Sequence, residues 1–345
     1  MVRMSEITTK KTWDNFLNKI GDFDFYHTYD YHQISKSEND KAVLLIYEHD
    51  DVIIGLPMVI RSITGTPYYD VTSVYGYCGP ISKNVTDKFD NSILIKNLTE
   101  YFRSKDIISI FSRLNPYVKS QSIVLNGYGE IVVGGKLVNI DVTIDKDMQR
   151  QSYQNRLKTH VNKSRRNCIV KRAETNKDIL EFIDIYYESM NRVNASSYYY
   201  FNTDYFFNLY KSNNFNTDIL LAIEKESSKI IAGSIFIKTN KIIQYHLSGT
   251  RSEYLHLMPN KLLIDEMRLI GTKENYKFFN LGGGLGGSNM DSLFKFKSSF
   301  SKDIKDFKLW KLIINQEIYD QLLKKNSLEK VNAISFFPLY RYSEK

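Results

Sequence analysis

Patterns typical of helices and strands alternate along the chain, and this alternation limits the fold more than any other feature of the 345 residues. Apolar residues recur at helical spacing at 11–20 and 87–105, whereas 42–62 has the pattern of two strands joined by a turn. Further strand patterns occupy 107–114 and 136–145. Such an alternation predicts an α/β protein with mixed sheets.

The same order of elements starts again near residue 146. The sequence predicts helices at 152–167, 177–193 and 260–276, three consecutive strands within 219–250, and single strands at 168–174 and 277–281. We therefore expect two domains in tandem, 1–145 and 146–310. A tail of strand and helix, 311–345, is expected to pack back on the first domain.

A glycine-rich stretch, FNLGGGLGGSNMD at 279–291, contains the spacing G-x-G-x-x-G. A dinucleotide fold would need further strand and helix repeats after this stretch, and a P-loop would need a Gly-Lys-Ser/Thr, but neither follows. Glycines at Gly283 and Gly284 permit a substrate to approach backbone N–H groups, and Asp291 suits a helix N-cap. A purely structural tight turn is the alternative.

The charge is +8 with a pI near 9.0, and the acidic and basic residues are interspersed. This balance favours an anionic partner. Cys78 and Cys168 lie far apart without metal-ligand spacing, so we expect reduced, buried thiols and no metal. The longest apolar runs have the length of strands, so we also expect no stable membrane insertion.

Two segments carry a resemblance to a known family: YHLSGTRSEYLHLMPNKLLIDEM at 245–267 and FFNLGGGLGGSNMDSLFKFKSSFS at 278–301. They resemble the second half of the Fem-type peptidoglycan bridge-forming transferases and of related acyltransferases with the GNAT fold. FYHTYDYHQIS at 25–35 is similar to a further landmark of the family. The resemblance implies two tandem GNAT-like domains, here without the coiled-coil arm of some members.

The resemblance also implies amide formation by transfer of an acyl or aminoacyl group to an amine. This chemistry needs a positioned carbonyl and a stabilised oxyanion but no protein nucleophile. Lys297 matches the family lysine placed near the reacting carbonyl, and His246 is a candidate base; the alternatives are a solvated lysine and a packed core histidine. We expect no permanently bound cofactor.

Further residues are implied to bind substrate. Arg192 matches an arginine that binds a diphosphate in some members, although an ion pair with Glu188 is the alternative. In the first domain Asn115 replaces a family aspartate and cannot act as a base, which argues for a different acceptor. The remaining expected substrate-binding residues are Tyr254, Asn260, Gly283, Gly284, Asp291, Arg113 and His32.

The expected donor is aminoacyl-tRNA, because the turn that binds the pyrophosphate of acetyl-CoA in GNAT enzymes is missing after 245–250. Basic residues along 156–172 are expected to contact the tRNA. The expected acceptor is a sugar-nucleotide or lipid-linked envelope precursor in the cytoplasm, at the inner face of the membrane. An acyl-CoA-dependent N-acyltransferase of an amino sugar and a non-catalytic glycan- or RNA-binding protein are the alternatives.

Overall fold

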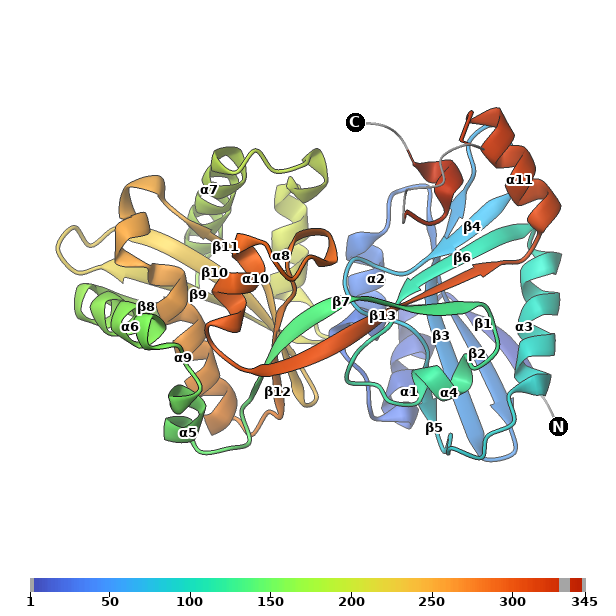
Figure 1. Ribbon diagram of the computed structural model, residues 1–345, viewed down its shortest axis with the longest axis horizontal. Coiled ribbons are helices and arrows are strands. Elements are labelled where there is room, and N and C mark those ends of the chain that lie inside the picture. Colours follow the sequence, from blue (N-terminus) through green and yellow to red (C-terminus); the bar gives the residue numbers. More distant parts are fainter. Residues whose placement is uncertain (1–2, 329–335, 343–345) are drawn as a thin grey trace. The chain divides into compact units, whose positions relative to one another are not determined.

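The computed structural model describes residues 3–328 and 336–342 and divides into two compact units (Figure 1). One unit comprises Met1–Gly134 and Asp306–Lys345, and the other comprises Gly135–Lys305. Residues 329–335 and 343–345 of the predicted tail lie outside the described residues. The boundary of the units falls inside two strands, β7 and β13, rather than in a linker.

The first unit contains a sheet in the order β1-β2-β3-β4-β6-β13, with β5 paired to β3. Its strands are β1 (Arg3–Ile7), β2 (Lys41–His49), β3 (Val52–Ser62), β4 (Tyr69–Thr72), β5 (Ile81–Lys83), β6 (Ile107–Arg113) and β13 (Asp303–Ile313). Its helices are α1 (Lys10–Ile20), α2 (Tyr29–Ser35), α3 (Ser92–Ser104), α4 (Gln121–Val124) and α11 (Gln316–Lys325).

Helix α3 shows why this unit folds as the pattern predicts. Leu94, Leu98 and Phe102 are spaced at four residues, share one face of the helix, and are buried against strand residues such as Val43 and Ile110. Burial of each such side chain stabilises the fold by about 1.5–3 kcal/mol. Helix α3 thereby covers one face of the sheet.

The C-terminal segment is held to the first unit by a buried carboxylate. Asp70 accepts hydrogen bonds from Arg61 Nε at 2.8 Å and from the hydroxyl of Tyr340 at 3.0 Å, and it pairs with Arg341. The Tyr340 hydroxyl also contacts Ser109 on β6. Strand β13 and helix α11 thus belong to the same unit as the N-terminal strands.

The second unit contains a sheet in the order β7-β12-β11-β10-β9-β8. Its strands are β7 (Glu130–Asp141), β8 (Cys168–Arg172), β9 (Asn216–Glu224), β10 (Ile230–Thr239), β11 (Ile242–Thr250) and β12 (Phe278–Gly282). Its helices are α5 (Lys146–Gln151), α6 (Asn155–Asn167), α7 (Asn176–Arg192), α8 (Thr203–Lys211), α9 (Pro259–Lys273) and α10 (Ser292–Ser298). The predicted helices and strands of this half are confirmed, whereas β7 starts earlier than expected.

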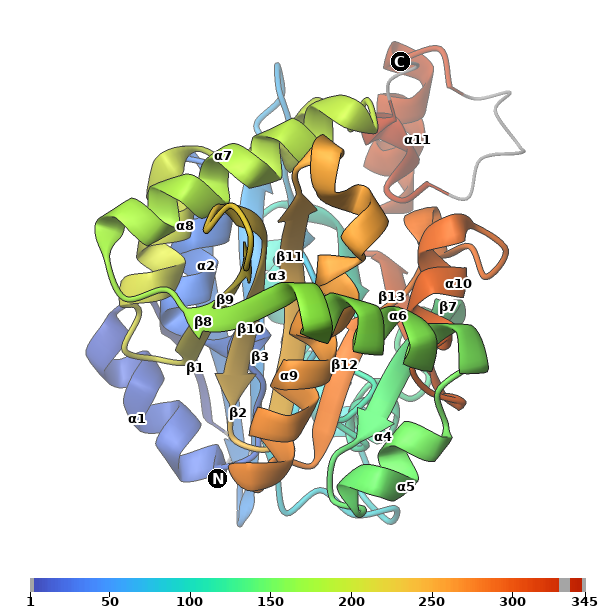
Figure 2. The same ribbon diagram turned by 90° about the vertical axis from the view of Figure 1, so that its left-hand side faces the viewer.

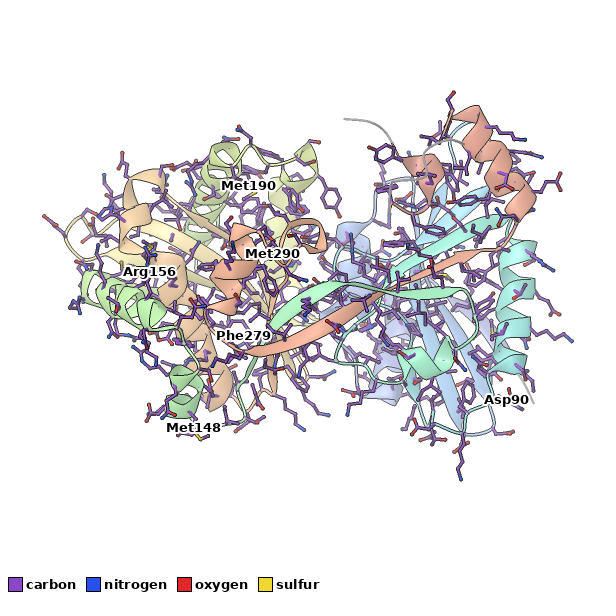
Figure 3. All side chains as sticks on the ribbon, viewed as in Figure 1. Asp90, Met148, Arg156, Met190, Phe279 and Met290 are labelled. Carbon is purple, nitrogen blue, oxygen red and sulfur yellow. The ribbon has the colours of Figure 1, made fainter. Side chains whose placement is uncertain are left out.

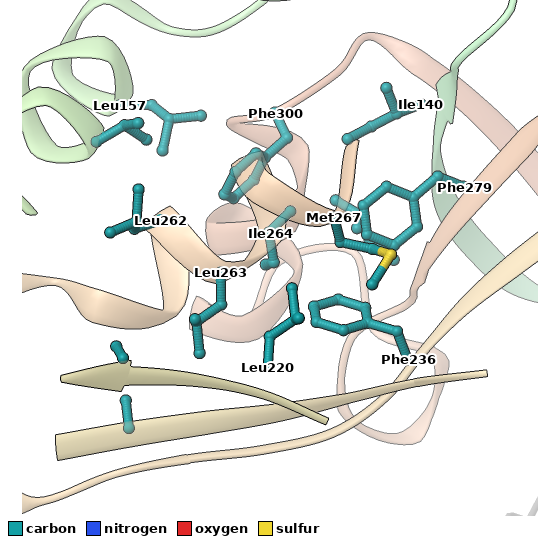
Figure 4. Close-up of a cluster of buried hydrophobic side chains, with 14 of the residues drawn as sticks. Ile140, Leu157, Leu220, Phe236, Leu262, Leu263, Ile264, Met267, Phe279 and Phe300 are labelled. Carbon is teal, nitrogen blue, oxygen red and sulfur yellow. The ribbon is translucent and has the colours of Figure 1, made fainter. Parts of the chain in front are cut away.

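Helices cover both faces of this sheet. Helix α9 packs on β9, β10 and β11 and on α6, and its apolar residues join Phe236, Phe279 and Phe300 in one buried cluster (Figure 4). Helix α7 packs on the opposite face, where Gly233 makes room for the ring of Phe182. Helix α8 packs beside α7 (Figure 2). Alternate residues of the central strands are therefore buried on opposite faces.

Strand direction distinguishes one strand pair in the second unit. β11 and β12 pair in parallel, whereas β7–β12, β8–β9, β9–β10 and β10–β11 are antiparallel. Helix α9 makes the crossover between the two parallel strands. None of the helices within 3–328 and 336–342 is long and apolar enough to cross a membrane.

Candidate acyl-transfer site

The parallel strands β11 and β12 separate soon after they pair. They are in register only at Ile242–Phe278, Ile243–Phe279 and Gln244–Asn280. At the last of these pairs the buried Asn280 Nδ2 donates to Gln244 Oε1 at 2.8 Å. In open α/β sheets, ligands bind where neighbouring parallel strands diverge at their carboxyl ends. The gap beyond Gln244 and Asn280 is therefore a candidate site.

Lys297 lies at this divergence. Its Nζ donates to the carbonyl of Gly283 at 2.8 Å, just past the end of β12, and lies 5.9 Å from the ring centre of Tyr245 on β11. The side chain comes from α10, and Lys297 is only 8% exposed. One ammonium thus contacts residues from both diverging strands.

Helix α10 is positioned by its cap and its aromatic face. The carboxylate of Asp291 accepts from the backbone N–H groups of Leu293 and Phe294 at 2.8 and 3.1 Å, which defines the start of the helix. Burial opposes the ionisation of Asp291, but these hydrogen bonds outweigh it and lower its pKa. Phe296 packs edge-on against Phe300. The cap at the start of α10 and the ring contact at its end therefore hold the helix, and with it Lys297, in position.

The glycine-rich loop provides room for this arrangement. Gly282 has φ +78°, and a Cβ there would lie 3.0 Å from Lys297 Nζ. A Cβ on Gly284 would lie 1.9 Å from Asp291 Oδ2 and 2.2 Å from the carbonyl of Ser288. Side chains at these positions would displace the lysine or the helix cap. Exposed Met290 lies on the same loop (Figure 3).

The environment of Lys297 makes its ammonium easy to deprotonate. Burial lowers the pKa of Lys297 to about 8, and the nearby Asp291 carboxylate opposes this shift. The lysine is therefore mostly protonated at pH 7. A poorly solvated cation of this kind interacts strongly with negative charge that develops beside it.

His246 lies on the other face of the sheet. Ile235 pairs with Leu247 and Phe236 pairs with Tyr245, so His246 is the extra residue of a β-bulge. Tyr245 packs against the α9 cluster, whereas His246 Nε2 contacts the Tyr205 hydroxyl on α8 at 2.7 Å. Burial lowers the pKa of His246 to about 3. The structure does not bring the two expected catalytic residues together.

Arg192 and Tyr254 lie near the carboxyl end of β11, and Asn260 lies in the first turn of α9. Arg192 does not pair with Glu188; its Nη1 donates to the carbonyl of Thr250 at 2.9 Å and to Ser252 Oγ at 3.0 Å. Glu188 instead pairs with Arg251, a residue that the sequence analysis missed.

Arg251 is the centre of an ion cluster on α7. It also pairs with Glu181 and Asp184, and the resulting groove of about 670 Å³ is lined by Tyr254. Asn260 is the second residue of α9, and its buried Oδ1 has no hydrogen-bond partner among the residues described. The sequence could have indicated this cluster, because the carboxylates within 177–193 recur at helical spacing.

The other three expected residues belong to the first unit. Asn115 is buried, and its Nδ2 donates to Asp24 Oδ2 and to the carbonyl of Tyr77, both at 3.0 Å. The Asn115 amide thus links the buried Asp24 carboxylate to the backbone at Tyr77. An aspartate at position 115 would instead repel the Asp24 carboxylate. The buried Asp24 is the physical reason why an amide rather than a carboxylate suits position 115.

His32 is fully buried 5.0 Å from the ring of Trp13 and donates from Nδ1 to the carbonyl of Thr28. Burial lowers the pKa of His32 to about 3, so the ring is neutral. The half-buried Arg113 guanidinium lies 5.7 Å from the ring centre of Phe111.

Within the described residues no group of three or more His, Cys, Asp or Glu side chains is arranged to hold a metal ion. Both cysteines are free and buried.

The strands, loop and helix of this arrangement lie in a segment that matches the model of a known protein family. Residues 216–308, which include β11, β12, the glycine loop and α10, match the model of the FemAB family. A search of curated protein sequences finds no match.

Solved structures with a similar fold cover most of the chain. The crystal structure of FemX matches with a TM-score of 0.72 at 12% identity, over 92% of this chain and 99% of that one. A conserved protein of unknown function from Bacteroides thetaiotaomicron matches with a TM-score of 0.59 at 12% identity, over 90% and 100%. The predicted α/β class with tandem GNAT-like domains is thereby confirmed.

Replacement of Lys297 by methionine is expected to stabilise the protein at pH 7 by up to about 3 kcal/mol, because a pKa unit corresponds to 1.36 kcal/mol. The unfolded chain keeps this proton up to about pH 10.5 and the folded chain only to about pH 8, so wild-type stability should rise with pH in that window. Urea unfolding at pH 7–10 measures both effects. Lys295→Met, at an exposed lysine, is the control; a less stable Lys297→Met protein would contradict the account.

Replacement of Asn115 by aspartate is expected to destabilise the protein at pH 7 by about 3 kcal/mol or more, because it buries a second carboxylate against Asp24. The loss should shrink as the pH falls toward 4, where one of the pair becomes protonated. Chemical unfolding at both pH values measures this difference. The exposed Asn162→Asp variant, beside Arg150, should stay within about 0.5 kcal/mol of wild type.

Proposed function

We propose that the protein is an amide-forming N-acyltransferase that moves an aminoacyl group from aminoacyl-tRNA to an amine of a cell-envelope glycan or peptidoglycan precursor. The observation that carries this proposal is the buried Lys297 ammonium at the divergence of β11 and β12. The FemAB-family segment contains every residue of that arrangement. The similarity to the same family supports the proposed acceptor class and a cytoplasmic site of action.

The reaction requires charge stabilisation more than covalent catalysis. A neutral amine attacks the ester carbonyl, so that a C–N bond forms and the carbonyl oxygen becomes an oxyanion. Lys297 donates a hydrogen bond to this oxyanion in place of the carbonyl of Gly283. When the C–O bond breaks, the ribose hydroxyl leaves with the proton that the amine has lost.

Proton transfer from the amine does not involve His246 in this proposal. The imidazole lies on the face of the sheet opposite Lys297 and contacts Tyr205. At this bulge Leu247 pairs with Ile235 and Tyr245 pairs with Phe236, and the ring centre of Tyr245 lies 5.9 Å from Lys297 Nζ. We assign His246 a structural role in shaping the strand.

The start of α9 favours tRNA over acyl-CoA as donor. GNAT enzymes that use acetyl-CoA bind its pyrophosphate with backbone N–H groups at this helix terminus. Here Met258 has φ +57°, and Pro259 occupies the first helical position, where it lacks an N–H group. Helix α9 therefore offers fewer backbone donors to a pyrophosphate.

The donor assignment can be tested by turnover. Purified protein is incubated with radiolabelled aminoacyl-tRNA in one reaction and with acyl-CoA in another, each with the same panel of amino sugars and envelope precursors. We expect an amide product, stable to base, only with aminoacyl-tRNA. Product from acyl-CoA alone would contradict the tRNA donor but keep the acyltransferase assignment.

Lys297→Met is expected to lower kcat about 10²- to 10³-fold, the usual effect of removing an oxyanion donor. Wild-type kcat should fall above about pH 8 as the ammonium is lost, whereas Lys297→Arg should keep partial activity without this alkaline decline. Unchanged turnover in the methionine variant would exclude the proposed role. Binding of both substrates with no turnover by wild type would favour a non-catalytic binding protein.

A further inference from the structure

Helix α6 presents a row of basic residues to the start of α9. Arg156, His160 and Lys163 are spaced at four and three residues and so share one face of the helix. Helix α6 packs against α9 and against the short 3-10 helix Ser252–Leu257 (Figure 2). Lys261, in the first turn of α9, lies next to this face. Arg156 is labelled in Figure 3.

Within these four residues, here called the cation cluster, Lys261 contacts His160. Lys261 Nζ lies 2.7 Å from His160 Nδ1, and Lys163 Nζ donates to the carbonyl of His256 at 3.1 Å. Across 3–328 and 336–342, no carboxylate lies within ion-pairing distance of Arg156, Lys163 or Lys261. Burial, and then the charge of Arg156, lowers the pKa of Lys261.

Nearby basic residues on the same segment are neutralised. Arg165 pairs with Asp265 and Glu266, and Arg172 pairs with Asp218. The structure thus divides the basic run 156–172 into neutralised residues and a set of cations without counter-ions. Lys163 in this run and Lys261 on α9 are partly buried cations of this kind, and the neutral His160 is partly buried as well. Charged groups removed from water are normally paired, so an anion from outside the protein suits this position.

The cation cluster lies next to the candidate acyl-transfer site. Lys261 Nζ is 6.0 Å from the ring centre of Phe296, which directly precedes Lys297 in α10. A ligand with its acyl carbonyl at Lys297 would therefore extend toward the cluster past a single aromatic ring. Aminoacyl-tRNA and acyl-CoA share one chemical feature here, because both carry phosphates attached to an adenosine nucleotide.

We propose that Arg156, His160, Lys163 and Lys261 form the binding site for the phosphate groups of the acyl donor. The inference rests on the proposed acyl transfer and adds which residues hold the donor. Side-chain cations take over here the role that backbone N–H groups play where a helix terminus binds a pyrophosphate. The neutral imidazole of His160 accepts from Lys261 and holds its ammonium in place.

Direct binding measurements test the site without turnover. The probes are an RNA hairpin that copies a tRNA acceptor stem with its single-stranded 3′ end, and coenzyme A. The variant is Lys163→Gln/Lys261→Gln. Its control, Lys158→Gln/Lys177→Gln, removes the same charge; Lys158 lies about 200° around α6 from Arg156, and Lys177 is exposed on α7.

We expect the double variant to weaken binding of one probe at least about tenfold, because two charge-assisted contacts are lost. For the RNA, the slope of log affinity against log salt should flatten by about 1.4–1.8, the contribution of two phosphate contacts. The control should bind like wild type. Loss for RNA identifies tRNA as the source of the phosphates, and loss for coenzyme A identifies an acyl-CoA.

Equal binding by the double variant and wild type, or no binding of either probe by wild type, would overturn this site. A separate outcome concerns the proposed function. If the double variant loses probe binding but wild type forms no amide from any donor, acyl transfer is wrong while the phosphate site stands. If wild type forms amide and the double variant raises KM for the donor with kcat little changed, both stand.

Discussion

The hydrogen bond from the Lys297 ammonium to the carbonyl of Gly283 is the interaction on which the candidate site depends. It places a cation beside the ends of two parallel strands that have just separated after Gln244 and Asn280. A buried charge without a close carboxylate partner is unfavourable for folding. Its presence is explained if the site is built to receive negative charge that appears only during the reaction.

Neighbouring residues in the sequence hold Lys297 in this position. Asp291 defines the start of α10, and Gly284 leaves the space that the Asp291 carboxylate occupies. Gly282 takes a positive φ and leaves room for Lys297 Nζ. The G-x-G-x-x-G stretch is thus a loop whose glycines leave space for the cap of α10 and for the Lys297 side chain. Backbone and side chain together, rather than a bound dinucleotide, account for the glycines.

Sequence patterns predicted the elements that bury one face, such as α3 and α9, because apolar spacing records burial directly. They predicted a tail of strand and helix on the first domain but placed its start at 311, whereas β13 begins at Asp303, since pairing across about 200 residues leaves no local trace. The bulge at His246 was equally hidden, and so was the contact of its ring with Tyr205 on α8. Lys297 itself was found through its resemblance to a family motif, whereas its burial required the fold.

A measured pKa of Lys297 would show directly whether its ammonium is buried in the candidate site. Protein labelled with ¹³C at lysine Cε can be titrated by NMR, with the Lys297 signal assigned by its absence from the Lys297→Met spectrum. We predict a midpoint near 8, well below the ordinary 10.5, because the ammonium is buried where β11 and β12 separate. A midpoint near 10.5 in the folded protein would show a solvated lysine and contradict the proposed site.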